Sequence, residues 1–166
     1  RKVAADLSPL PAAGPLAEPV VMGIYLIIGA DNTVTIVNPR PDMGQGPRTS
    51  LPMALAEELE VAWLQVHVQQ APADSRYGNQ TSGGSTSTRT FFTPMRQAGA
   101  AAKEMLVAAA AARWGVPAAD CRAEQGTVVH TATGRRLTYG ELAGDAAKLP
   151  VPQSPALKNP ADFRLI

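Results

Sequence analysis

Residues 80–114, QTSGGSTSTRTFFTPMRQAGAAAKEMLVAAAAARW, join a polar, glycine-rich loop to the longest predicted helix. Thr93 as a cap and Pro94 as the first helical residue are typical of a helix start, and Gly115 is typical of a helix end. The alanines, together with Gly99, leave small faces against which another element can pack closely. The sequence therefore predicts a helix over residues 93–114 as the element on which the fold packs.

A second backbone-exposing loop lies upstream, at residues 42–49, DMGQGPRT. Thr49 or Ser50 can cap the helix that follows it, and Pro52 is tolerated in the first turn of that helix. A helix over residues 49–59 is predicted from leucines at helical spacing, namely Leu51, Leu55 and Leu59.

Three strand patterns and a further helix complete the expected elements. Residues 23–37 predict a β-hairpin with its turn at 29–32, and residues 64–69 alternate like a half-buried strand. Residues 121–131 predict a second hairpin that turns near Gln125 and Gly126, and a capping box formed by Thr138 and Glu141 starts a short helix that ends near residue 148. The predicted fold class is α+β, with two β-hairpins and a central strand packed on one long and two shorter helices.

The expected domain covers residues 20–148, with an arm at each end. Residues 1–19 are rich in Pro and Ala and are typical of an extended arm or linker. Residues 149–166 contain four prolines, and we expect them to be an extended connection to a missing or separate partner region. The chain begins at Arg1 without a methionine, so we expect a processed, trimmed or partial chain from which any targeting peptide has gone.

The composition indicates a globular domain and argues against several function classes. The 166 residues are 45% apolar and 17% charged, with a net charge of +1. This balance gives no electrostatic reason to expect nucleic acid or an anionic membrane surface as a partner. No apolar run reaches the roughly 20 residues of a membrane span.

The residues that commonly bind metals or act as nucleophiles are few and scattered. Cys121 is the only cysteine, and we expect it to be a small buried hydrophobe. His67 and His130 lie in different predicted strands, so no protein-ligated metal site is predicted. We identify no catalytic residue in this chain and expect Glu57, Glu58 and Glu141 to be surface or capping groups.

The two glycine loops are the candidate binding site. Each offers glycines that let a ligand approach the main chain and side chains that hydrogen-bond it, which is typical of a large, phosphate-bearing ligand. The loops could also be a plain strand-to-helix turn and a flexible Gly/Ser/Thr linker. The second loop lacks the lysine of a P-loop and the glycine spacing of a dinucleotide-binding turn, which argues against ordinary nucleotide hydrolysis.

An ordered set of short motifs is similar to one family. The set closely resembles the amino-terminal part of the molybdopterin-binding large subunit of isoquinoline 1-oxidoreductase-like and aldehyde dehydrogenase-like molybdenum hydroxylases, in the xanthine oxidase superfamily. The resemblance covers residues 25–166. The motifs are MGQG at 43–46, AEEL at 56–59, QAPAD at 70–74, YGNQ at 77–80, GGS at 83–85, RQAGAA at 96–101, WGVP at 114–117 and LTYGEL at 137–142.

The resemblance implies a molybdenum cofactor, molybdopterin cytosine dinucleotide, and a partial layer of the domain that binds it. It implies that the first loop contacts the pterin side through Gly44, Gln45 and Gly46, with Thr49 a weaker candidate. It implies that the second loop holds the diphosphate and nucleotide through Ser82, Gly83, Gly84, Ser85, Thr86, Ser87 and Thr88. Relatives often carry a basic residue after GGS, where this chain has Thr86.

The resemblance also implies an activity that this chain performs only within an assembled enzyme. That activity is oxidation of aldehydes or N-heterocycles with water-derived oxygen, with electrons passing to a [2Fe–2S] partner subunit. Other expected partners are the remaining large-subunit region and a cytochrome c subunit. The resemblance favours a periplasmic location, with the cytoplasm as the alternative. Two rival interpretations remain: a stand-alone nucleotide-like cofactor-binding module or cofactor chaperone, and a structural domain whose glycine loops merely turn the chain.

Overall fold

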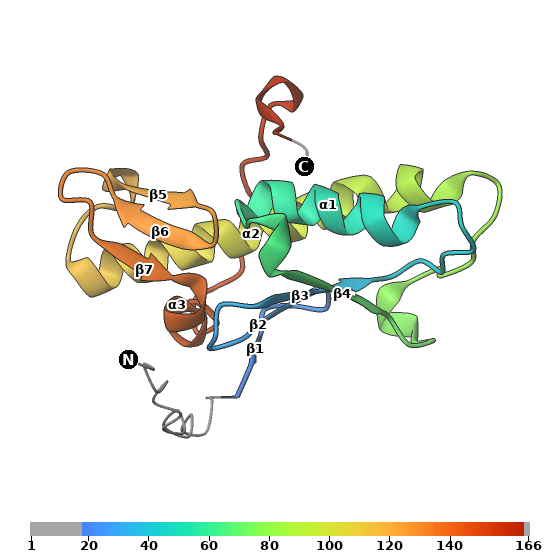
Figure 1. Cartoon of the computed structure of the whole chain (residues 1–166), viewed down its shortest axis with the longest axis horizontal. Coiled ribbons are helices and arrows are strands. Elements are labelled where there is room, and N and C mark those ends of the chain that lie inside the picture. Colours follow the sequence, from blue (N-terminus) through green and yellow to red (C-terminus); the bar gives the residue numbers. More distant parts are fainter. Residues whose placement is uncertain (1–17, 165–166) are drawn as a thin grey trace, which may run out of the picture.

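A computed structural model describes residues 18–164 and contains two sheets that pack against two neighbouring helices at different positions along them (Figure 1). The first sheet has the order β1 (Val20–Val21), β2 (Leu26–Ile28), β3 (Val34–Asn38) and β4 (Val66–Gln70). Strands β1, β2 and β3 are antiparallel, whereas β3 and β4 are parallel. The predicted first hairpin is confirmed as β2 and β3, and the parallel pairing of β4 was not predicted.

A β-α-β unit follows from this pairing, because α1 (Pro47–Leu59) connects β3 to its parallel neighbour β4. A short 3₁₀ turn, η1 (Trp63–Gln65), precedes β4. Apolar residues of α1 face the sheet and α2 and are fully buried, as the leucine spacing predicts; they are Leu51, Leu55 and Leu59. The helix starts two residues earlier than predicted, and neither Thr49 nor Ser50 caps it.

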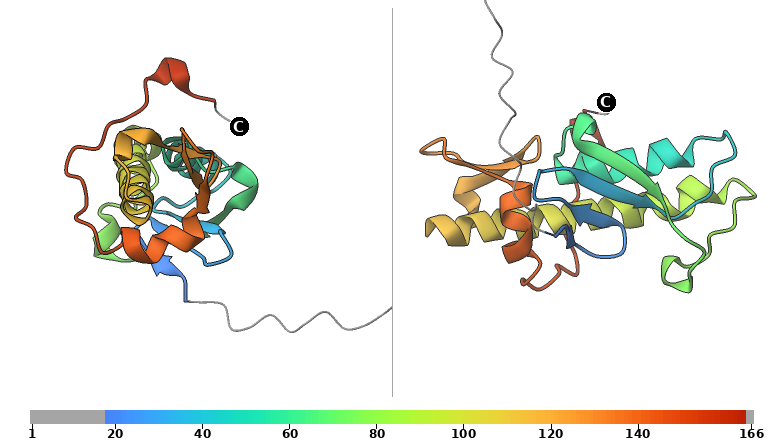
Figure 2. Two further views of the ribbon diagram at one scale, coloured as in Figure 1. Left: turned by 90° about the vertical axis from the view of Figure 1, so that its left-hand side faces the viewer. Right: turned by 60° about the horizontal axis from the view of Figure 1, so that its bottom comes forward.

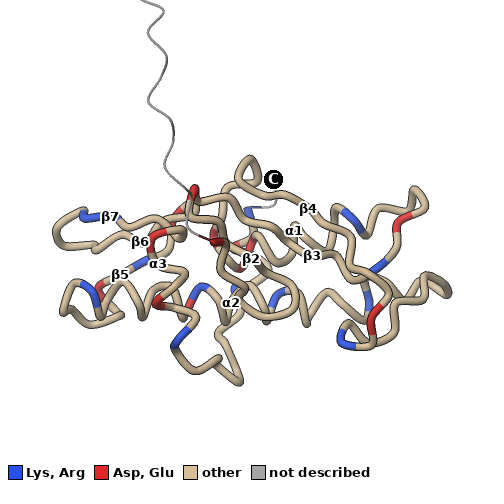
Figure 3. The backbone as a smooth tube through the Cα atoms, turned by 90° about the horizontal axis from the view of Figure 1, so that it is seen from below, with Lys and Arg blue, Asp and Glu red and all other residues tan. Residues whose placement is uncertain are grey.

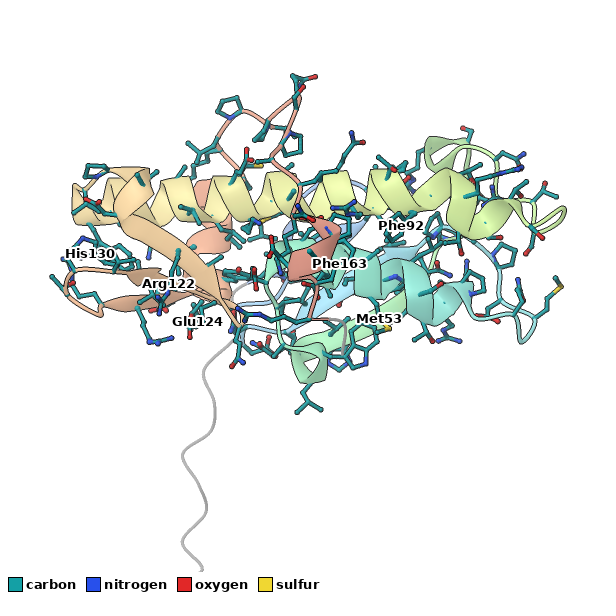
Figure 4. The ribbon with its side chains drawn as sticks, turned by 90° about the horizontal axis from the view of Figure 1, so that it is seen from above. Met53, Phe92, Arg122, Glu124, His130 and Phe163 are labelled. Atoms are coloured by element: carbon teal, nitrogen blue, oxygen red, sulfur yellow. The ribbon has the colours of Figure 1, made fainter. Side chains whose placement is uncertain are left out.

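Helix α2 (Thr86–Trp114) has 29 residues and runs beside α1 in the same direction (Figures 1 and 4). It ends at Gly115, as predicted, with a left-handed φ of 66°. The predicted start at Thr93 and Pro94 is wrong by seven residues. Pro94 removes one backbone hydrogen bond, but the helix continues through it because Phe91 and Met95 on the flanking turns are buried in the core.

The second sheet has the order β5 (Cys121–Glu124), β6 (Thr127–His130) and β7 (Arg136–Thr138), all antiparallel. The predicted turn is confirmed, with positive φ at Gln125 and Gly126, and β7 is an additional strand. Helix α3 (Tyr139–Ala146) begins with the predicted capping box. The buried Tyr139 hydroxyl donates to the Leu59 carbonyl at 2.6 Å, which joins the second sheet's helix to the end of α1.

Helices α1 and α2 approach most closely at Gly99. A Cβ at this position would lie 2.4 Å from the Leu55 carbonyl oxygen and 3.1 Å from the Glu58 Cβ. Buried alanines of α2 line the same packed core, including Ala102, Ala109 and Ala110. The predicted small faces are therefore used, and glycine is required where the two backbones meet.

A buried charge cluster lies beside this contact. Arg96 pairs with Glu58 at 2.7 Å, and Lys158 pairs with Glu57 at 2.6 Å and with Glu60 at 2.8 Å. Glu57 and Glu58 are only 8% and 0% exposed, so the expectation that they are surface groups is wrong. Spacing alone could not show that their partners come from α2 and from the end of the chain; Glu141, in contrast, is the predicted capping group.

The C-terminal segment, residues 149–164, folds back onto the helices. It passes around the outside of α2 and carries one short turn, η4 (Pro160–Asp162) (Figure 2). The Lys158 amide donates to Glu58 at 3.0 Å, and the Arg164 amide donates to Glu57 at 3.1 Å. Phe163 lies under the Arg96 guanidinium, 4.8 Å from it (Figure 4).

The remaining expectations concern single residues and the chain ends. Cys121 is half-buried rather than buried, and desolvation raises the pKa of its thiol. His67 lies in β4 and His130 in β6, as predicted. The predicted arm at residues 1–19 falls almost wholly outside the described residues, and the connecting role of residues 149–166 stays a prediction.

The close approach at Gly99 makes a matched pair of glycine substitutions informative. Gly99→Ala should lower the free energy of unfolding by about 2–3 kcal/mol, because the new methyl overlaps the backbone of α1. Gly144→Ala in α3 meets nothing within 4 Å and should raise it by about 0.5–1 kcal/mol. Urea unfolding of both variants measures the difference, and equal effects would show that the helices do not pack through Gly99.

The buried ion pair predicts a second contrast. Glu58→Gln leaves the Arg96 guanidinium buried without its carboxylate and should lower the free energy of unfolding by about 3–5 kcal/mol. Asp145→Asn removes the partner of Arg113 in an ion pair whose side chains are about 40% exposed. This substitution should change the free energy of unfolding by only about 0–1 kcal/mol. Denaturant curves test both, and a Glu58→Gln protein as stable as the Asp145→Asn protein would contradict the structural role of the cluster.

Candidate functional site

The two glycine loops meet at one end of the molecule. Each loop follows the carboxyl end of a parallel strand, β3 or β4, and leads into the amino terminus of a helix, α1 or α2 (Figure 1). The carboxyl edge of parallel strands is where open α/β sheets bind ligands, because the loops there are free of the sheet and the helix amides point outward. The fold thus brings together loops that lie about forty residues apart in sequence.

Hydrogen bonds join three successive residues of the second loop to the first loop or to the two residues shortly before it. The Gln80 amide donates to the Pro39 carbonyl at 3.2 Å. The Arg40 guanidinium donates to the Thr81 carbonyl, and the Gln45 amide donates to the Ser82 hydroxyl at 2.8 Å. The loops therefore form one structural unit, and a linker role for the second loop is not supported by its contacts.

The first loop is closed around the carboxylate of Asp42. This carboxylate accepts from the amides of Gly44 at 2.7 Å and Arg48 at 2.9 Å, with a longer bond from Gly46 at 3.4 Å. These amide donors, first that of Arg48 and then that of Gly44, hold the pKa of Asp42 below its usual value. Asp42 thereby replaces the hydroxyl cap expected at Thr49, and it neutralises the positive end of α1.

The second loop leaves the amino terminus of α2 open. Ser85 precedes the helix with a left-handed φ of 54°, and no side chain caps the first turn. The Thr86 hydroxyl donates back to the Gly83 carbonyl at 2.7 Å. The Thr86 amide donates to the Gly83 carbonyl at 3.2 Å, and the next amides of the first turn, which no side chain caps, carry a positive partial charge that attracts an anion.

A cavity of about 610 Å³ lies between the loops. Its lining is uncharged and consists of main chain, hydroxyls, one amide and two apolar residues: Met43, Gln45, Pro47, Ser82, Gly83, Ser85, Thr86, Ser87 and Thr88. The open space, the hydroxyl donors and the helix amino terminus fit an extended ligand with a phosphate portion, as a molybdopterin dinucleotide has.

Most of the predicted site residues line this cavity, and some do not. Gln45, Ser82, Gly83, Ser85, Thr86, Ser87 and Thr88 contribute to the lining, whereas Gly44, Gly46, Thr49 and Gly84 lie beside it without being part of it. Gly44, Gly46 and Gly84 have positive φ values of 105°, 90° and 57°, which the turns require. The predicted contacts of all these residues with a cofactor stay predictions.

Sequence reasoning missed three residues that organise the site. Asp42 could have been found from the Asp-X-Gly pattern, since an aspartate often accepts amides two residues ahead. Gln80 and Arg40 act across sequence separations of about forty residues, and no local pattern signals those bonds. Within residues 18–164, no cluster of three His, Cys, Asp or Glu side chains could hold a metal ion, and no helix is long and apolar enough to span a membrane.

The fold and the cleft define an α+β binding domain whose site is built from two loop-to-helix junctions. The molybdopterin cofactor-binding domain family matches residues 12–164, and the chain belongs to that family. It is 41% identical over 156 residues to the beta chain of isoquinoline 1-oxidoreductase from Brevundimonas diminuta, and the match covers 86% of this chain and 20% of that protein.

Two further comparisons agree with this family assignment. The chain is 30% identical over 164 residues to one of the subunits of nicotinate dehydrogenase from Pseudomonas putida, and the match covers 94% of this chain and 14% of that protein. Its fold is similar to quinoline 2-oxidoreductase from Pseudomonas putida 86, with a TM-score of 0.56, 19% identity, and 75% and 16% of the two chains covered. The chain thus spans a fifth or less of these relatives, which are named as oxidoreductases or a dehydrogenase.

The Asp42 cap predicts how the first loop responds to acid. Because the pKa of Asp42 is depressed in the folded state, its carboxylate stabilises the loop above the ordinary pKa of 3.8, and this contribution is lost as the pH falls through the lower folded value. NMR titration should show the Gly44 and Arg48 amides shifting together with a midpoint below 3.8. Asp42→Asn should abolish that transition, and a midpoint at or above 3.8 in the unaltered protein would contradict the cap.

Proposed function

We propose that this chain holds the pterin and diphosphate portions of a molybdenum cofactor, in the cytosine dinucleotide form, within a molybdenum hydroxylase. The observation that carries the proposal is the hydrogen-bonded junction of the two loops, which creates one cleft at the open amino terminus of α2. When bound, the molybdenum cofactor would supply the chemistry that oxidises a carbon centre with oxygen derived from water. Aldehydes and N-heterocycles are the proposed substrates.

The residues of this chain divide the binding task by their chemistry. The α2 amino terminus and the hydroxyls of Ser85 and Ser87 are donors suited to phosphate oxygens. Gln45 is held by Pro41 and Ser82, and its oxygen accepts from the Met43 amide at 2.6 Å, so the amide is fixed before a ligand arrives. Both N–H groups of this amide are already donated, so it offers a pterin the remaining acceptor position of its oxygen.

The chain supplies no general base in this proposal. Glu57 and Glu58 are engaged in the buried cluster, and Glu141 caps α3. Catalysis therefore depends on the remaining large-subunit region, and electrons pass to a [2Fe–2S] partner subunit, with a cytochrome c subunit as a further partner. The proposed location of the assembled enzyme is the periplasm, with the cytoplasm as the alternative.

Gly83 offers a direct test of the cleft. A Cβ at this lining position meets nothing within 4 Å and needs no positive φ, so Gly83→Val should change the melting temperature of the enzyme by no more than about 2 °C. The new side chain occupies space that the ligand needs, so molybdenum and released CMP in the purified enzyme should fall about tenfold or more. Metal analysis and nucleotide chromatography measure both.

Gly144→Ala, a glycine substitution with open space away from the cleft, is the matched control and should retain full cofactor. Full retention in Gly83→Val would contradict the proposed site. Nucleotide retained in a protein that carries no hydroxylase subunits would instead favour the stand-alone binding module. A complete enzyme that contains neither molybdenum nor CMP would favour a purely structural domain.

A further inference from the structure

Arg40 is a buried cation without a carboxylate partner among the described residues. Its side chain belongs to a residue only 2% exposed, and its Nε has no hydrogen-bond partner. The guanidinium lies over the Phe91 ring at 4.8 Å. Two other cations with largely buried side chains, Arg96 and Lys158, each pair with glutamates. A buried charge is costly unless it is balanced, so the charge of Arg40 requires an explanation.

The contacts of Arg40 bracket the cavity lining of the second loop. One terminal nitrogen donates to the Thr81 carbonyl, directly before the lining segment 82–88. The other donates to the Thr90 hydroxyl at 2.9 Å, and that hydroxyl donates to the Thr86 carbonyl at 2.7 Å. Arg40 therefore fixes both the entrance of the loop and the first turn of α2.

The cavity lining itself contains no charged side chain. A diphosphate bound there would meet hydroxyls and the helix amino terminus, with no lysine or arginine among the lining residues. Such a ligand needs positive charge nearby, and Arg40 has positive charge that no acidic group in the described chain neutralises. The unbalanced positive charge of Arg40 thus complements the negative charge of a diphosphate in a cavity whose lining has no cation.

We propose that Arg40 is a positioning residue for the anion site: from beneath the second loop it holds residues 81–90 in the binding conformation and supplies the positive charge that balances a bound diphosphate. This inference rests on the proposed function, and it assigns the charge of that site to a residue outside the lining. Arginine is suited to the role because its planar fork can bind two separate acceptors at once.

The test uses the complete large subunit with its partners, stripped of cofactor, and inorganic pyrophosphate as the probe. Arg40→Gln should weaken pyrophosphate binding about tenfold, whereas Arg40→Lys, which keeps the charge but not the fork, should weaken it about threefold. Arg122→Gln, an exposed position of β5 far from the loops (Figure 4), is the matched control and should change it less than twofold. Calorimetry gives the affinities, and melting without pyrophosphate reports folding.

Partial rescue by lysine separates a charge role from a purely structural one, which would affect glutamine and lysine alike. If the unaltered enzyme binds pyrophosphate and Arg40→Gln binds it equally well, this inference is overturned and the proposed function is left intact. No pyrophosphate binding by the unaltered enzyme would overturn both. Should Arg40→Gln not fold, Thr90→Val removes one acceptor of the fork at an exposed position, and an unchanged affinity there would overturn the inference as well.

Discussion

The contact of α1 with α2 at Gly99 is the constraint on which the rest of the structure depends. The two backbones meet where a methyl group would overlap the Leu55 carbonyl, so the helices lie close at this point, and they run in the same direction. Since each helix is entered from a glycine loop, aligned helices bring the two loops to the same end. The cleft therefore depends on helix packing some three turns away from it as well as on the parallel strands and the hydrogen bonds between the loops.

The charges of the chain are arranged so that acidic groups secure the fold and leave positive character at the cleft. Glu57, Glu58 and Glu60 bind cations and amides from α2 and the C-terminal segment, well away from the loops. Figure 3 shows basic and acidic positions interspersed along the molecule, in keeping with the net charge of +1. Net charge therefore gives no selective attraction for an anion, and the proposed anion site depends on local features, among them an uncapped helix end and one buried guanidinium.

The sequence predicts best the features that a few adjacent residues determine. The Gln125-Gly126 turn, the Thr138 capping box and the end of α2 at Gly115 all follow from local backbone preferences, and all are confirmed. The parallel pairing of β3 with β4 and the early start of α2 depend on tertiary packing, which outweighed the helix-start signal of Thr93 and Pro94. The loops could be chosen as candidates from their composition, but Asp42, Arg40 and Gln80 gain their roles only through the fold.

The two helix amino termini at the cleft are alike in position and differ in electrostatic state. Asp42 occupies the donors of the first loop, so the beginning of α1 offers a neutral, shaped surface with a fixed Gln45 amide. No side chain caps α2, and Arg40 lies beneath its first turn, so this beginning offers positive potential. A ligand with a polar, uncharged end and a phosphate-bearing end would thus bind in one orientation. The difference arises from a carboxylate and a guanidinium two residues apart in sequence, each directed to a different loop.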